Sequence, residues 1–131
     1  MKIVFVVLTL ALLSGVNAQA QDRIRPGIYE LKINDHPVAS RCYPAAEVKD
    51  LNSDARTLED WQKKTAVRAQ CSLKDFKVSG NTVSFTLVCL DHTTATTGTY
   101  RGDSFDTFNT VTRGNAVTKS HMQGRRTGDC K

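Results

Sequence analysis

The sequence lacks the closely spaced cysteine pairs that mark zinc and thiol-redox sites. Its 131 residues include four cysteines, and no two of them are separated by only two or three residues. Structural zinc sites and dithiol redox motifs both rely on such short spacing. No recognised catalytic or cofactor motif is present either. We therefore predict no metal site and no cofactor.

The sequence has only one long apolar run, and it stands at the N-terminus. Residues 3–13 are apolar except for Thr9 and follow a lysine. The run is shorter than the about 20 residues that a membrane-spanning helix needs. A basic start, an apolar centre and small residues at Ala18 and Ala20 are typical of a secretory signal peptide. We predict a signal peptide over 1–20, cleaved after Ala20 or alternatively after Ala18, and no membrane span once it is removed.

The remaining residues, 21–131, suffice for one domain and contain no repeat or interdomain linker. The whole sequence has 18 lysines and arginines against 13 acidic residues. These basic residues are scattered, whereas nucleic-acid binders gather them in stripes with interleaved aromatics. We therefore expect no nucleic-acid partner, and we interpret the charge as a solvated surface with mild attraction to anionic surfaces.

The four cysteines, Cys42, Cys71, Cys89 and Cys130, all follow the predicted signal peptide. An even number in a small exported chain predicts two disulfides, because exported proteins fold in oxidising compartments. The sequence thus predicts a periplasmic or otherwise secreted protein.

Alternation of apolar and polar residues predicts about seven antiparallel strands. The first begins at Pro26-Gly27, where Tyr29, Leu31 and Ile33 then share one face. The others are expected at 38–43, 73–79, 82–90, 93–100, 104–112 and 116–126. Because the last five follow one another as a meander, the sheet should curl. We predict a mainly β fold, either a strongly curved sheet or a partial barrel.

One helical insert is predicted between the second and third strands. Residues 45–51 follow Pro44, which suits a first helical turn, and a second helical segment covers 57–70 with Thr57 as its N-cap. The insert should cover an open face or end of the sheet. Trp61, the sole tryptophan, should anchor it there.

The hairpin signal at Gly80-Asn81 determines how the cysteines pair. A two-residue turn would set Cys71 opposite residue 90, one position beyond Cys89. One bulge residue would bring the two cysteines opposite each other, at a separation that suits a disulfide. We therefore pair Cys71 with Cys89 and Cys42 with Cys130. The second bond should clamp the last strand to the end of the second strand and stop the C-terminal edge from peeling.

Arg125 and Arg126 are the strongest candidates for ligand contact. Consecutive strand residues face opposite sides, so one of the two points inward. An inward arginine needs an anionic partner, which is either Glu30 or the carboxylate or phosphate of a ligand. Tyr100 and Arg101 stand at the turn between the strands expected at 93–100 and 104–112. They are candidates for lining the mouth of the curved sheet.

No residue is predicted to be catalytic. The three histidines are far apart in the sequence, and His121 and its neighbour Ser120 point to opposite faces of a strand. Asp103 and Asp106 stand in or beside a turn, where a carboxylate usually bonds the backbone.

Several blocks of the sequence resemble an exported bacterial family. These are "RPGIYE" (25–30), "CYP" (42–44), "CSLKDFKVSGNTVSFTLVC" (71–89), "YRGDSF" (100–105) and "GRRTGDC" (124–130). The chain is similar in them to domain-of-unknown-function family 3617, although Tyr29 replaces the tryptophan usual in that family's first block. The resemblance implies a signal-bearing periplasmic domain and no reaction.

Two functions therefore compete. The favoured one is a non-enzymatic periplasmic domain that binds a small apolar or anionic ligand, or an envelope protein, because curved sheets with an open end form such pockets. The alternative is a periplasmic hydrolase, which needs ionisable groups that converge in a cleft.

Overall fold

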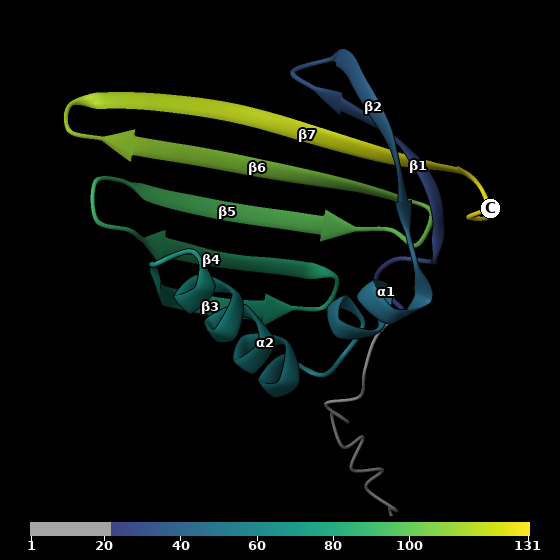
Figure 1. Ribbon diagram of the computed structural model, residues 1–131, viewed down its shortest axis with the longest axis horizontal. Helices are drawn as coiled ribbons and strands as arrows, with labels where there is room; N and C mark the ends of the chain where they lie inside the picture. Colours follow the sequence, from purple (N-terminus) through teal and green to yellow (C-terminus); the bar gives the residue numbers. More distant parts are fainter. Residues whose placement is uncertain (1–21) are drawn as a thin grey trace, which may run out of the picture.

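Seven antiparallel strands form one sheet, as the alternating sequence predicts (Figure 1). The structure is a computed structural model that describes residues 22–131, so the predicted signal peptide, 1–20, lies outside the described residues. The strands are β1 (Gly27–Ile33), β2 (His36–Tyr43), β3 (Ser72–Ser79), β4 (Thr82–Val88), β5 (Thr93–Tyr100), β6 (Ser104–Arg113) and β7 (Ala116–Gly128).

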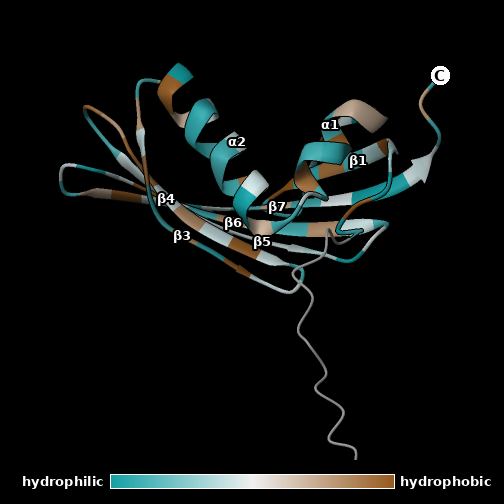
Figure 2. Cartoon of the chain, turned by 90° about the horizontal axis from the view of Figure 1, so that it is seen from below, coloured by the Kyte–Doolittle hydropathy of each residue, from teal (hydrophilic) through white to brown (hydrophobic). Residues whose placement is uncertain are grey.

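The order of the strands is β2-β1-β7-β6-β5-β4-β3, with β2 and β3 at the two edges. The last five strands form the predicted meander, and Figure 2 shows that the sheet is strongly curved and open. One expectation is wrong. The last strand is not an edge, because β7 lies between β6 and β1. Alternation along a strand identifies its buried face but does not identify its neighbours.

The β3–β4 hairpin contains the bulge that the cysteine spacing requires. Val78 lies opposite Val83, whereas Ser72 lies opposite Val88, and the register shifts between Lys74 and Lys77. Asp75, within this interval, has a φ of 54°. An extra residue in a left-handed conformation is a common form of β-bulge. The shift by one residue sets Cys71, which precedes β3, opposite Cys89, which follows β4.

Two helices, α1 (Ala45–Leu51) and α2 (Ala55–Arg68), connect β2 to β3 and lie on the concave face (Figure 2). The second helix begins earlier than predicted, because its N-cap is Asp54 rather than Thr57. The Asp54 carboxylate accepts a hydrogen bond from the Thr57 backbone N–H at 2.9 Å. An aspartate accepts such a bond at least as well as a threonine, so the helix gains one turn.

The core lies on the concave face, between α1 and the strands β1, β6 and β5. Tyr29 is completely buried there, and its ring centroid lies 5.4 Å from that of Tyr43 and 5.8 Å from that of Phe105. The Tyr29 hydroxyl donates to the Arg25 carbonyl at 2.7 Å and lies 3.1 Å from the Gly102 carbonyl. The phenol therefore joins the aromatic core to the segment that precedes β1.

Hydrogen bonds hold residues 22–26, the segment that precedes β1, in the fold. Ile24 is 1% exposed, and the Asn52 side chain accepts from its N–H at 3.1 Å and donates to its carbonyl at 2.8 Å. Arg23 is 2% exposed and donates to the carbonyls of Leu51 and Ser53 at 2.7 and 2.8 Å. Carbonyls at the end of a helix attract a cation, so they offset part of the cost of burying this guanidinium. Burial lowers the pKa of Arg23, but the group remains charged.

The packing of Phe105 depends on a glycine in the neighbouring strand. Phe105 lies opposite Gly124, and a Cβ at Gly124 would fall 2.2 Å from the Phe105 ring. We expect Gly124→Ala to lower the free energy of unfolding by about 1–3 kcal/mol, as overpacked cores do. Gly128→Ala is the matched control in the same strand, because its Cβ would meet nothing within 4 Å. Urea denaturation of both variants measures the difference, and equal stabilities would contradict this account.

Candidate functional site

The four residues predicted to contact a ligand do not converge on one site. Arg125 lies opposite Glu30 and Ser104 and is exposed on the convex face, the face of the sheet away from the helices. Arg126 lies on the other face, as the alternation requires. Tyr100 lines a cleft under α2, whereas Arg101 is exposed beside the β5–β6 turn.

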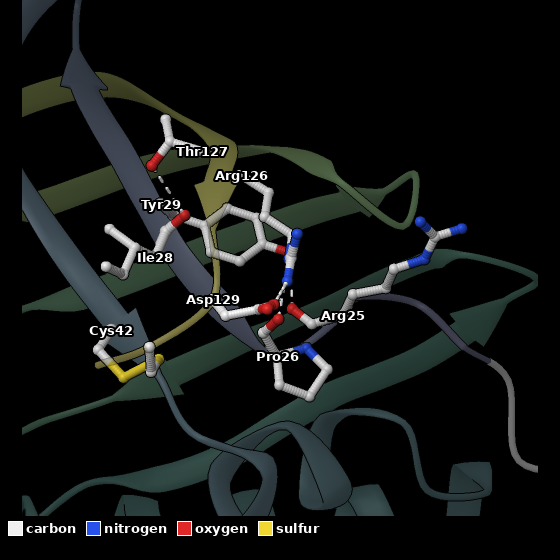
Figure 3. Close-up of a disulfide and its surroundings, with 9 residues drawn as sticks. Arg25, Pro26, Ile28, Tyr29, Cys42, Arg126, Thr127 and Asp129 are labelled. Carbon is white, nitrogen blue, oxygen red and sulfur yellow. Dashed lines mark hydrogen bonds and ion pairs between the residues drawn. A yellow bond between two sulfur atoms is a disulfide. The ribbon is translucent and has the colours of Figure 1, made fainter.

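Arg126 has a structural partner, and it is not Glu30. Its Nε donates to the Pro26 carbonyl at 2.9 Å, and its guanidinium pairs with Asp129 (Figure 3). Asp129 is only three residues further along the chain. Glu30 lies opposite Arg125 and therefore on the other face of the sheet from Arg126. Arg126 thus fastens the C-terminal segment to the start of β1, and its side chain needs no ligand.

The C-terminal segment is also held by a disulfide. The structure joins Cys42 to Cys130, at the end of β2, and Cys71 to Cys89, at the open end of the β3–β4 hairpin. These are the two pairs deduced from the sequence. Because β1 lies between β2 and β7, the bond from Cys42 to Cys130 ties the segment that follows β7 to the end of a strand that β7 does not pair with (Figure 3).

An apolar cleft lies between α2 and the sheet. Its volume is about 210 Å³. Most of its walls are aromatic or aliphatic side chains from both helices and from β3 to β5: Leu51, Leu58, Trp61, Phe76, Val83, Phe85 and Tyr100. Trp61 is only half-buried, so the tryptophan expected to anchor the helix also forms one wall of an open space.

The hairpin register places two of these rings together. Phe76 and Phe85 stack with centroids 6.4 Å apart and planes 20° apart. Neither ring was predicted from the sequence to line a site. The signal was available, because a turn at Gly80-Asn81 sets 76 opposite 85 and 78 opposite 83, which brings four apolar residues to one face.

The polar groups of this cleft are neutral or already paired. Glu47 is its one charged wall residue, and the Glu47 carboxylate accepts from Arg41 at 2.6 Å. Gln62, Thr96 and Tyr100 supply uncharged hydrogen-bonding groups. Burial raises the pKa of the Tyr100 phenol, which therefore stays protonated at neutral pH.

A second polar arrangement lies on the convex face. The Asp106 carboxylate is 2.5 Å from Arg101 and 2.6 Å from His121 Nε2. Partial burial raises the pKa of Asp106, but hydrogen bonds from these two partners outweigh it and lower the pKa below its ordinary value. Asp106 therefore bonds across strands, and the expectation that it bonds its local backbone is wrong. The register explains this, because His121 stands diagonal to Asp106 on adjacent strands.

This aspartate–histidine pair lacks a partner for nucleophilic catalysis. Within residues 22–131, no serine or threonine hydroxyl is hydrogen-bonded to the His121 ring, and every cysteine is in a disulfide. The described part of the chain also contains no group of three His, Cys, Asp or Glu residues placed to hold a metal ion. None of its helices is long and apolar enough to cross a membrane.

Together these features define a disulfide-bonded, open antiparallel β domain with a helix-covered apolar cleft. The model of a family described as a protein of unknown function (DUF3617) matches residues 24–130, and the chain belongs to that family. Neither the curated proteins nor the solved structures include a match to this chain.

Proposed function

We propose that residues 21–131 form a non-enzymatic, extracytoplasmic binding domain whose ligand is a small, uncharged molecule with an apolar ring. The cleft under α2 carries this proposal. Its walls come from both helices and from three strands, so the fold as a whole shapes the space. Apolar walls with a few polar groups are the usual composition of small-molecule sites.

The volume of the cleft limits the size of the ligand. At about 210 Å³ it lies below the about 300–1,000 Å³ of typical drug-sized sites. It exceeds the roughly 150 Å³ of an engineered apolar cavity that binds benzene. A ligand with one or two fused rings fits this range.

Charge favours a neutral ligand over an anionic one at this site. An anion would need a free cation to replace its lost hydration. Arg41 contacts this cleft through the wall residue Glu47, with which it already pairs, and it lies 4.4 Å over the ring of Tyr43. A hydroxyl or amide on the ligand has Gln62 as a partner. It can also donate to the Thr96 hydroxyl, which itself donates to Asn109 at 2.8 Å.

The cellular location is part of the same proposal. Two disulfides are typical of proteins that fold outside the reducing cytosol, and the N-terminal sequence has the pattern of a signal peptide. Native mass spectrometry of protein taken from the periplasm tests location and binding together. We expect a chain that begins at residue 19 or 21 and carries a small apolar molecule. A chain that retains residue 1 would contradict the proposed export.

Blocking the cleft should abolish binding. Trp61 is the sole tryptophan and a wall of the cleft, so its fluorescence reports occupancy directly. We expect Prodan (6-propionyl-2-dimethylaminonaphthalene), a neutral probe with two fused rings, to quench Trp61 by energy transfer. Thr96→Phe should weaken its binding at least tenfold, because the added ring fills the cleft.

Ala95→Phe is the matched control, because Ala95 is exposed and adjacent strand residues face opposite sides. Its affinity for the probe should equal that of the unaltered protein. Circular dichroism melting verifies that both variants fold. Equal affinities in the two folded variants would contradict the proposal.

A further inference from the structure

We propose that the convex face along β6 and β7 is a second binding site, and that its ligand is an acidic oligosaccharide, a chain of sugar rings that bear carboxylates. The site, here called the convex track, comprises Lys32, Phe108, Lys119, His121 and Arg125. It lies on the opposite face of the sheet from the cleft under α2, so it is independent of the function proposed above.

An exposed aromatic ring stands at the centre of the convex track. Phe108 is 54% exposed on a face that otherwise carries mostly threonines and charged residues. Its ring stacks on that of His121, with centroids 4.2 Å apart and planes 7° apart. The electron-rich face of an aromatic ring attracts the positively polarised C–H groups of a sugar ring.

The stack is held in place before any ligand arrives. Asp106 bonds His121 Nε2 at 2.6 Å. The Asn34 side chain accepts from the His121 backbone N–H at 2.9 Å, and the Asn34 N–H donates to the His121 carbonyl at 2.8 Å. Because these bonds fix His121, the Phe108 ring loses little freedom on binding, which lowers the entropic cost of association.

Two hollows flank the ring along the same pair of strands. One, of about 360 Å³, is lined by 104–106 of β6 and 123–125 of β7, together with Glu30 and Lys32. The other, of about 180 Å³, is lined by 108–110 and 119–121, together with Asn34. Four residues of strand span roughly 13 Å. An elongated ligand of a few sugar rings can therefore lie in both hollows and across Phe108.

Unpaired charges along the convex track determine which charge its ligand should carry. Lys32, Lys119 and Arg125 are exposed, and none of them has an ion-pair partner among residues 22–131. Among the residues that line the two hollows, Glu30 is the one carboxylate without an ion-pair partner. This surplus of positive charge complements a ligand with carboxylates. A guanidinium binds a carboxylate through two parallel hydrogen bonds.

Isothermal titration of the mature chain with a galacturonate hexamer tests the convex track. We expect Phe108→Ala to weaken binding at least tenfold, whereas Phe108→Trp should preserve or strengthen it. Val117→Ala is the matched control, because Val117 is 58% exposed on the same face of β7 and lines neither hollow. Its affinity should be unchanged. Both positions are exposed, so the three variants should fold.

Two further probes separate ring recognition from charge attraction. Cellohexaose has sugar rings without carboxylates, so it should bind at least tenfold more weakly than the galacturonate hexamer. Polyphosphate has charge without rings, so any binding of it should be insensitive to Phe108→Ala. The proposal is overturned if Phe108→Ala leaves the galacturonate affinity unchanged, or if cellohexaose binds equally well. Binding to anionic phospholipid vesicles that is stronger than the hexamer's and indifferent to Phe108 would overturn it as well.

Discussion

Replacing Cys42 and Cys130 together by serine is expected to lower the free energy of unfolding by about 4.5 kcal/mol, because it frees a closed loop of nearly the whole domain. The two residues are 88 positions apart in the sequence. Domains are stabilised by about 5–15 kcal/mol in total, so a substantial part of this variant should be unfolded at 37 °C. Urea denaturation followed by circular dichroism measures the loss.

The double variant of Cys71 and Cys89 is the comparison. Its loop spans only 18 positions, so the same chain-entropy argument predicts a smaller loss of about 3 kcal/mol. The order of the two losses is the decisive result. A larger loss from the shorter loop would show that local strain or packing, rather than loop closure, governs the contribution of these bonds.

Tyr29→Ala is the second change with a large expected effect, a loss of about 5 kcal/mol. Removing a fully buried aromatic ring costs about 3–5 kcal/mol through lost burial and the cavity that remains. The phenol also bonds the Arg25 carbonyl, and each such bond contributes about 1 kcal/mol. The same urea experiment measures this loss.

Tyr29→Phe separates the ring from its hydroxyl. It keeps the contacts with Tyr43 and Phe105 and removes only the hydrogen bonds, so we expect a loss of about 1–3 kcal/mol. Hydrogen exchange should accelerate in residues 22–26, which the phenol secures. If the phenylalanine variant were as unstable as the alanine variant, the aromatic packing around Tyr29 would not be the main stabilising contact.

Local features of the fold were predictable because local rules determine them. Alternation identified the strands, and the turn at Gly80-Asn81 set a register from which one bulge residue and the Cys71–Cys89 pair followed. The place of the bulge, at Asp75, was not predicted. The N-cap was not identified correctly, because Asp54 and Thr57 both suit that position and the choice depends on where the preceding chain runs.

Long-range neighbours were not predictable from the same rules. Nothing in the pattern of β7 distinguishes an edge strand from one that lies between β6 and β1. The same gap hid the pairing of His121 with Asp106, because these residues lie on neighbouring strands. The pairing of Arg126 with Asp129 is different, because it joins residues three apart in the chain and follows from local spacing.

The candidate site was predictable only as a class. A curved sheet with a helical insert implied a space between them, but the arginines chosen as its contacts lie elsewhere. Trp61 was assigned to anchoring alone, because a half-buried tryptophan on a helix has the same sequence pattern whether it fills a gap or lines one.

The position of β7 also determines when the molecule can finish folding. The opening hairpin, β1 and β2, joins the rest of the sheet solely through the final strand. During synthesis β1 and β2 therefore have no further neighbour in the sheet until β7 has been made, and the bond from Cys42 to Cys130 cannot form before then. A polypeptide cut short before β7 would leave the β1–β2 hairpin unpaired with the rest of the sheet and β6 as an exposed edge, so the two parts of the sheet join only once β7 is complete.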